Sequence, residues 1–163
     1  FAAFMLAPIA MSLYYSFTDY PLLERPLWVG AANYARLLGD GVFLRAVGKT
    51  LVYCAVSIPL STACALAIAS LLTARVRAAG LFQAAVFVPT LVPMAAGAMI
   101  WLWLLNGEDG LVNRMLRGVG LPGPNWLTDA LWAMPAIVLI TLWGLGQSVV
   151  VYAAALREVP EQL

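Results

Sequence analysis

Four side chains near the C-terminal end of the chain are of types that bind hydroxyl-rich solutes. Thr141, Trp143, Gln147 and Ser148 lie in the run 130–156, which contains no charged residue. At about 100° per residue they share half the surface of one continuous helix. An amide in hydrocarbon needs hydrogen-bond partners, which a neighbouring helix or a watery cavity can supply. Gln147 therefore indicates either packing between helices or a path for neutral solutes, in which the indole offers a stacking face.

The residues that most enzymes use are missing from the apolar runs. The chain has no histidine, and no aspartate or glutamate lies inside any long apolar run. These absences exclude histidine triads and histidine metal sites, and also the intramembrane carboxylates of aspartyl proteases and ion-coupled carriers. Gly48-Lys49-Thr50 imitates the end of a phosphate-binding loop, but Phe43 occupies the position where that loop needs a glycine. We expect no catalytic residue, metal or cofactor here, so that any transport is passive or driven by a partner.

Composition places the chain among polytopic membrane proteins. Of its residues 63% are hydrophobic and 10% charged, the mean hydropathy is +0.90, and the net charge of +1 gives no case for nucleic acid. Four uncharged runs, at about 1–17, 50–72, 81–105 and 130–156, predict four membrane-spanning helices in one domain, residues 1–163. We expect an all-α transmembrane bundle with no sheet. The apolar start predicts that the first span is incomplete.

The connections predict the orientation of these spans. The segment 73–79 carries Arg75 and Arg77 without an acidic residue, as short cytoplasmic loops do. Both ends of the chain are then cytoplasmic. The outer connections hold six Lys or Arg against three inside, but they are several times longer and also carry six acidic residues. We therefore give the density of positive charge more weight than its total.

Local signals predict further details within this frame. In the outer connection 18–49, Asn33 is a candidate cap for a short interfacial helix, and residues 43–47 form a second amphipathic turn. Small residues at four-residue spacing in the second span favour close helix packing. Gly144 and Gly146 are expected to loosen the last span. Kinks are expected at the prolines inside the spans, Pro59, Pro89, Pro93 and Pro135. An aromatic belt is expected at the outer boundary, from Tyr14, Tyr15, Tyr20, Trp28, Trp101, Trp103, Trp126 and Trp132.

Several short patterns occur in the order and spacing of one family. They are Trp28-Val29-Gly30, Asn33-Tyr34, Phe82 with Phe87, Pro89 and Pro93, Asn106 with Gly110 and Asn113, Trp126-Leu127 with Asp129, and Ala154-Ala155-Leu156 before Val159-Pro160. Together they resemble the permease subunits of binding-protein-dependent ABC importers, of the maltose and glycerol-3-phosphate sugar type. Lys49 and Gln147-Ser148 depart from the family's usual residues. The family's Glu-Ala-Ala coupling motif is expected to begin about two residues after Leu163.

The resemblance implies an ATP-driven importer that works by alternating access in a bacterial or archaeal plasma membrane. A solute-binding protein would deliver a small hydrophilic solute of the sugar type to two paired permeases, and two cytoplasmic ATP-binding subunits would drive the cycle. Thr141, Trp143, Gln147 and Ser148 would line the path, while Leu156, Val159 and Pro160 would lead to the ATPase contact. A secondary carrier or channel, and a membrane anchor without a path, remain the alternatives.

Overall fold

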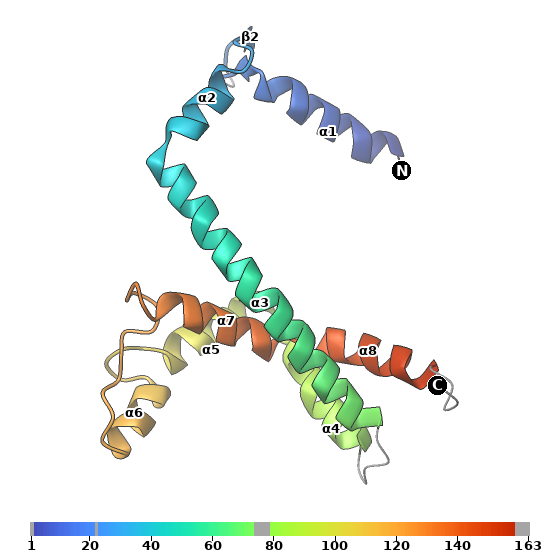
Figure 1. The fold of residues 1–163 in the computed structure, drawn as a ribbon, viewed down its shortest axis with the longest axis vertical. Helices are drawn as coiled ribbons and strands as arrows, with labels where there is room; N and C mark the ends of the chain where they lie inside the picture. The colour runs from blue at the N-terminus through green and yellow to red at the C-terminus, as the bar shows by residue number, and fades with distance from the viewer. Residues whose placement is uncertain (1, 22, 74–78, 159–163) are drawn as a thin grey trace. The chain divides into compact units, whose positions relative to one another are not determined.

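The computed structural model describes residues 2–21, 23–73 and 79–158, whose regular secondary structure is almost entirely helical (Figure 1). The expected all-α class is therefore confirmed. The chain forms two compact units, residues 1–52 and 53–163, whose boundary falls inside helix α3.

The first unit begins with helix α1, Ala2–Ser16, which has 15 residues and no charge. It is shorter than the roughly 20 residues that a spanning helix needs. After it, strands β1 (Thr18–Asp19) and β2 (Leu27–Trp28) pair antiparallel, with Thr18 opposite Trp28. The expectation of no sheet is thus wrong at this one hairpin. Its connection contains two prolines, which favour a turn over a continued helix.

Helix α2, Ala32–Gly39, follows the hairpin. Asn33 does not cap it, because Ala31 precedes the helix and no side chain bonds to its first turn. The Asn33 amide instead donates to the backbone oxygens of Ser16 and Thr18, each at 3.0 Å. The Tyr34 hydroxyl lies 2.6 Å from Ser16 Oγ. Hydrogen bonds to the end of α1, not a local cap, therefore hold α2 in place.

Helix α3, Gly41–Thr73, runs unbroken for 33 residues. It starts at Gly41 because the Asp40 carboxylate accepts the backbone N–H of Val42 at 2.7 Å, as an N-cap does. The separate amphipathic turn expected at 43–47 is wrong, since these residues belong to α3. Pro59 lies inside the helix without interrupting it. Of the described residues, α3 is the one single helix long and apolar enough to cross a membrane.

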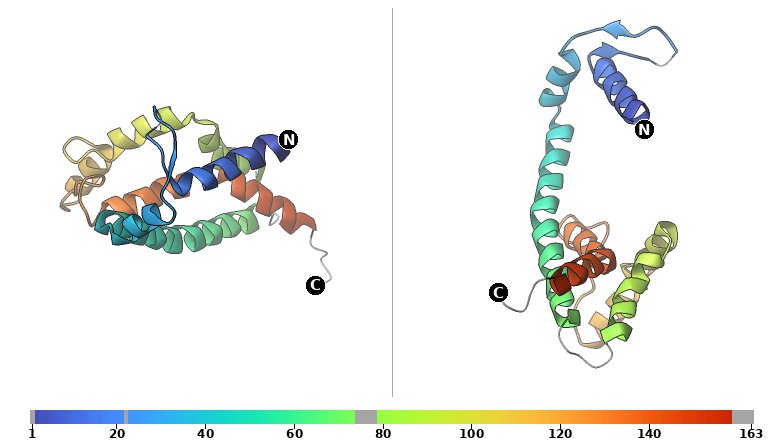
Figure 2. Two further views of the ribbon diagram at one scale, coloured as in Figure 1. Left: turned by 90° about the horizontal axis from the view of Figure 1, so that it is seen from above. Right: turned by 90° about the vertical axis from the view of Figure 1, so that its right-hand side faces the viewer.

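Two broken helix pairs follow in the second unit (Figures 1 and 2). Helix α4 (Ala79–Phe87) continues through the 3₁₀ turn η1 (Val88–Leu91) into α5 (Met94–Leu104), with a bend of 98°. Helices α7 (Ala133–Trp143) and α8 (Gly146–Glu158) meet at a bend of 51°. By length and composition, each pair counts as one further span if the bend lies within the membrane. The depth and side of each span stay predictions.

The bends occur at some of the expected positions. The first lies between Pro89 and Pro93, which confirms the kink expected there. The second lies at Gly144, which confirms that the glycines loosen the last span. The kink expected at Pro135 is wrong, because Pro135 is the third residue of α7. A proline in the first turn replaces an N–H that has no partner within the helix.

The core of the second unit lies where α3 meets α8. Ala65 and Ala69 of α3 are fully buried against Val149 and Ala153 of α8. Small residues of α3 therefore lie at this helix contact, which agrees with the packing predicted from their spacing. This contact fixes the helix that carries Gln147.

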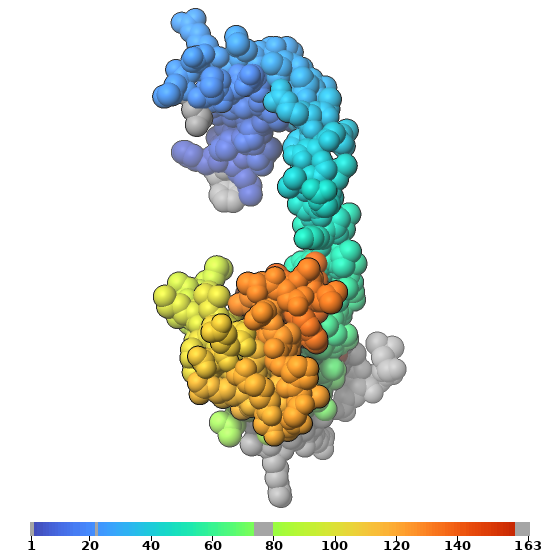
Figure 3. Space-filling view, turned by 90° about the vertical axis from the view of Figure 1, so that its left-hand side faces the viewer, coloured from blue at the N-terminus to red at the C-terminus, as the bar shows by residue number. Residues whose placement is uncertain are grey.

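The connection between α5 and α7, drawn in yellow to orange in Figure 3, is compact. Asn113 of helix α6, Leu111–Gly118, lies buried within it. The fully buried Asn113 amide donates to the carbonyls of Gly107 at 2.8 Å and Pro124 at 3.0 Å. Its oxygen accepts the indole N–H of Trp126 at 2.7 Å. The connection that joins the two broken helix pairs is therefore ordered by hydrogen bonds to one buried side chain.

Candidate functional site

Thr141 lies on α7, and its hydroxyl is already satisfied by the protein. Its Oγ1 donates to the Ile137 carbonyl at 2.9 Å and lies 2.8 Å from the Tyr53 hydroxyl of α3. Because the single hydroxyl proton of Thr141 is donated to Ile137, Tyr53 is the donor in the second bond. Thr141 therefore joins α7 to α3, which is the packing alternative for a polar residue in a span.

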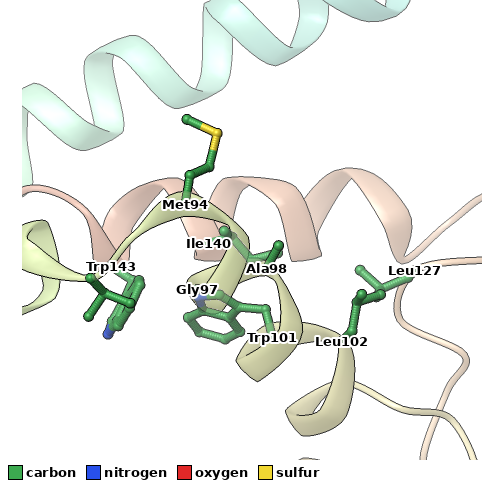
Figure 4. A pocket seen from close by; sticks show the side chains of 9 residues that line it. Met94, Gly97, Ala98, Trp101, Leu102, Leu127, Ile140 and Trp143 are labelled. Atoms are coloured by element: carbon green, nitrogen blue, oxygen red, sulfur yellow. The ribbon is translucent and has the colours of Figure 1, made fainter.

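Trp143, the last residue of α7, forms one wall of a cavity of about 430 Å³ (Figure 4). Its ring stands at right angles to that of Trp101 on α5, with ring centroids 5.8 Å apart. The cavity lies between α5 and α7, and its walls are otherwise aliphatic. The residues that line it are Val92, Met94, Gly97, Ala98, Trp101, Leu102, Leu127, Ile140 and Trp143.

Gln147 and Ser148 lie beyond the bend, on α8. Because the helix is interrupted at Gly144, the four side chains do not share one helical face, and that expectation is wrong. Both side chains are exposed, and neither makes a side-chain hydrogen bond within the described part of the chain. They are thus available to solute, lipid or another subunit, unlike Thr141.

Gly146 sets the position of these exposed residues. A Cβ placed on Gly146 would collide with the carbonyl oxygen of Val86, and it would lie 3.0 Å from Phe87 Cα and 2.9 Å from Thr90 Cγ2. The start of α8 thus rests directly on the backbone where α4 becomes η1. The bend of one broken pair is packed against the bend of the other.

The approach to the expected ATPase contact is described only at its start. Leu156, on α8, is partly buried and packs against the core that α8 makes with α3. Val159 and Pro160 lie outside the described residues.

The side chains at this site are of types suited to binding. No group of three or more Cys, Asp or Glu that could hold a metal occurs among the residues described. The site offers an indole ring for stacking, and an exposed amide and hydroxyl for hydrogen bonds, which suits a neutral polar solute.

Sequence reasoning overlooked two residues of this site, Tyr53 and Trp101. A tyrosine hydroxyl inside an apolar run was a signal for Tyr53, because a buried hydroxyl needs a partner. Trp101 was assigned to the aromatic belt, although it lines the cavity. No local signal separated it from its neighbour Trp103, because the side that each indole faces depends on the bend of the pair.

Comparison with known proteins supports the predicted resemblance. The chain is 30% identical to the lactose transport system permease protein LacF of Rhizobium radiobacter, over 99% of this chain and 55% of that protein. It is 26% identical to the probable ABC transporter permease protein YesP of Bacillus subtilis, over 98% of this chain and 52% of that protein. The chain spans about half the length of the curated relatives it matches. No protein-family model matches it.

The same fold occurs in a solved transporter. The crystal structure of a bacterial ABC transporter involved in the import of the acidic polysaccharide alginate matches with a TM-score of 0.83, over 98% of this chain and 54% of that one. The sequence identity is 23%. The partial permease fold expected from the sequence is thus confirmed.

Proposed function

We propose, from the similarity of this chain to ABC transporter permeases over nearly its whole length, that it forms part of a permease subunit of an ATP-driven importer for a sugar-type solute. The observation that carries the proposal is the match to LacF along 99% of the chain, together with the shared importer fold. The absence of carboxylates from the apolar runs agrees with a transporter whose energy comes from a partner.

The proposed partners follow from the same relatives. We place the chain in a cell membrane beside a second permease, with ATP-binding subunits at the cytoplasmic side. A related structure holds the alginate transporter in complex with an alginate pentasaccharide-bound periplasmic protein. A solute-binding protein is therefore the proposed donor of solute to this permease.

The solute path is assigned to the residues that remain free to meet a solute. Trp143 supplies a ring face at the cavity, and Gln147 and Ser148 supply hydrogen-bonding groups on α8. Thr141 acts beside them through its bond to Tyr53, which holds α7 against α3. A neutral solute is favoured because the apolar run 130–156, which carries these side chains, contains no charged residue.

Proteoliposomes test the transport proposal. The full-length protein, with its partner subunits and binding protein, is reconstituted and offered radiolabelled lactose, maltose and trehalose. Uptake of at least one sugar is expected to require both internal ATP and the external binding protein. Uptake that follows a proton or sodium gradient without ATP would show a secondary carrier instead.

Substitutions test the assigned path. Trp143→Ala and Gln147→Ala are expected to lower uptake while the subunit stays in the membrane. Val151→Ala is the matched control, because Val151 lies one turn after Gln147 on α8 and is likewise exposed. Full uptake by both path variants would contradict the path, and full function of Gln147→Leu would favour a membrane anchor.

A further inference from the structure

The indole N–H of Trp101 has no conventional hydrogen-bond partner. Of the buried side-chain nitrogen and oxygen atoms in the described residues, Trp101 Nε1 is the one without an acceptor. Buried donors are nearly always paired, so this exception needs a physical explanation. The apolar walls of the adjacent cavity offer no oxygen to it.

The ring of Trp143 lies next to the Trp101 indole. The two ring planes are 84° apart, with centroids 5.8 Å from each other. In Figure 4 the Trp101 nitrogen lies on the side of its ring that is turned toward Trp143, whose ring is seen edge-on. The electron-rich face of an aromatic ring attracts the positive edge of another and can accept an N–H.

A second contact from the same helix face supports this arrangement. Gly97 lies one turn before Trp101 on α5, and a Cβ there would lie 3.5 Å from Trp143 Cζ3. The Trp143 ring therefore lies against one face of α5, at Gly97 and at Trp101. Trp143 keeps 36% of its surface exposed, which leaves part of the ring free.

We propose that Trp101 is a positioning residue for Trp143: its buried N–H points into the Trp143 ring face and fixes the orientation of that ring in the cavity. The positioning itself does not depend on transport. Its consequence for solute binding rests on the proposed function, because Trp143 matters to the solute only if it lines the path.

Nuclear magnetic resonance of the indole N–H groups tests the contact. The full-length protein is labelled with indole-¹⁵N tryptophan in lipid nanodiscs, and Trp101→Phe identifies the Trp101 resonance. A proton over an aromatic face is shielded, so this resonance is expected upfield of that of Trp103, which lies two residues away and is 62% exposed. In Trp143→Leu it is expected to move downfield to the Trp103 range, and in Trp143→Phe to keep part of the upfield shift. A Trp101 resonance already in the Trp103 range, or one unmoved in Trp143→Leu, would overturn the proposal.

Uptake kinetics separate the positioning from the transport function. With the sugar that the reconstituted protein takes up, Trp101→Phe is expected to raise KM several-fold and to leave the maximal rate within twofold. Trp103→Phe is the control and is expected to change neither. If the upfield shift is present but Trp101→Phe and Trp143→Ala both transport normally, the positioning holds and the path assigned to Trp143 fails. If the shift is absent, the positioning fails whatever the uptake.

Discussion

Gly146 offers the sharpest test of how the two broken helix pairs are assembled. Replacing it with alanine adds one methyl group where α8 meets the turn after α4. That methyl would overlap the carbonyl oxygen of Val86 and lie 3.0 Å from Phe87 Cα and 2.9 Å from Thr90 Cγ2. Two of these three neighbours are backbone atoms, which cannot turn away as a side-chain end can. Gly146→Ala therefore forces the two bends apart.

The expected cost follows from overpacking. An extra methyl in a closely packed site typically destabilises by about 1–3 kcal/mol. The better helix propensity of alanine offsets at most about 1 kcal/mol of this. The net loss is then on the order of 1–2 kcal/mol, and at roughly 2–4 °C per kcal/mol the melting temperature should fall by several degrees.

Gly144→Ala is the matched control, since it adds the same methyl two residues away. Its Cβ would have Thr141 O as its nearest neighbour at 3.7 Å, which is an ordinary contact. The backbone φ of −89° suits alanine, so a neutral or slightly stabilising effect is expected. Thermal unfolding of the full-length protein in detergent, followed by tryptophan fluorescence, measures both variants. Equal melting temperatures for Gly146→Ala and Gly144→Ala would refute the close approach of α8 to α4.

Three further substitutions test other contacts. Tyr53→Phe removes one hydrogen bond between α3 and α7 and should cost about 0.6 kcal/mol, the average for such bonds in membranes, in the same unfolding assay; a loss above about 2 kcal/mol would mean that Tyr53 does more than bond Thr141. Asn113→Leu leaves the Trp126 N–H and two carbonyls unpaired, so a loss of about 3 kcal/mol or more in the free energy of unfolding is expected, together with faster tryptic cleavage at Arg114 and Arg117. Unchanged cleavage would contradict the role of Asn113 in ordering this connection. Asn33→Ala removes both bonds from α2 to the carbonyls of Ser16 and Thr18, so a protease specific for glutamate should cut faster after Glu24. Exposed Arg36→Gln is the control, and equal rates in the two variants would count against the tertiary role of Asn33.

Local chemistry accounts for the parts of the fold that the sequence predicts well. Long uncharged runs need helices, because backbone groups in lipid must bond within their own segment. Pro89 and Pro93 remove two backbone donors within five residues, so a break between them follows from the residues alone. The resemblance to ABC permeases likewise rests on motif order, and relatives along the whole chain bear it out.

Tertiary contacts decided the rest. Asn33 has the type of a helix cap, but it is the second residue of α2, and its Nδ2 donates to the carbonyls of Ser16 and Thr18. Pro135 carries the same signal as Pro89, yet it falls in a first turn, where a proline costs little.

The candidate site, too, was predicted in part from the sequence and decided in part by tertiary contacts. The sequence by itself determined which side chains carry polarity in the last apolar run, because those types are uncommon there. It did not determine which of them are free to meet a solute, because the partner of Thr141 is Tyr53, which lies 88 positions away in the sequence. A helical wheel assumes a straight axis, and the bend at Gly144 separates Trp143 from Gln147. Whether a polar group binds a solute or a neighbouring helix depends on what packs beside it, and packing between distant segments is set only by the folded chain.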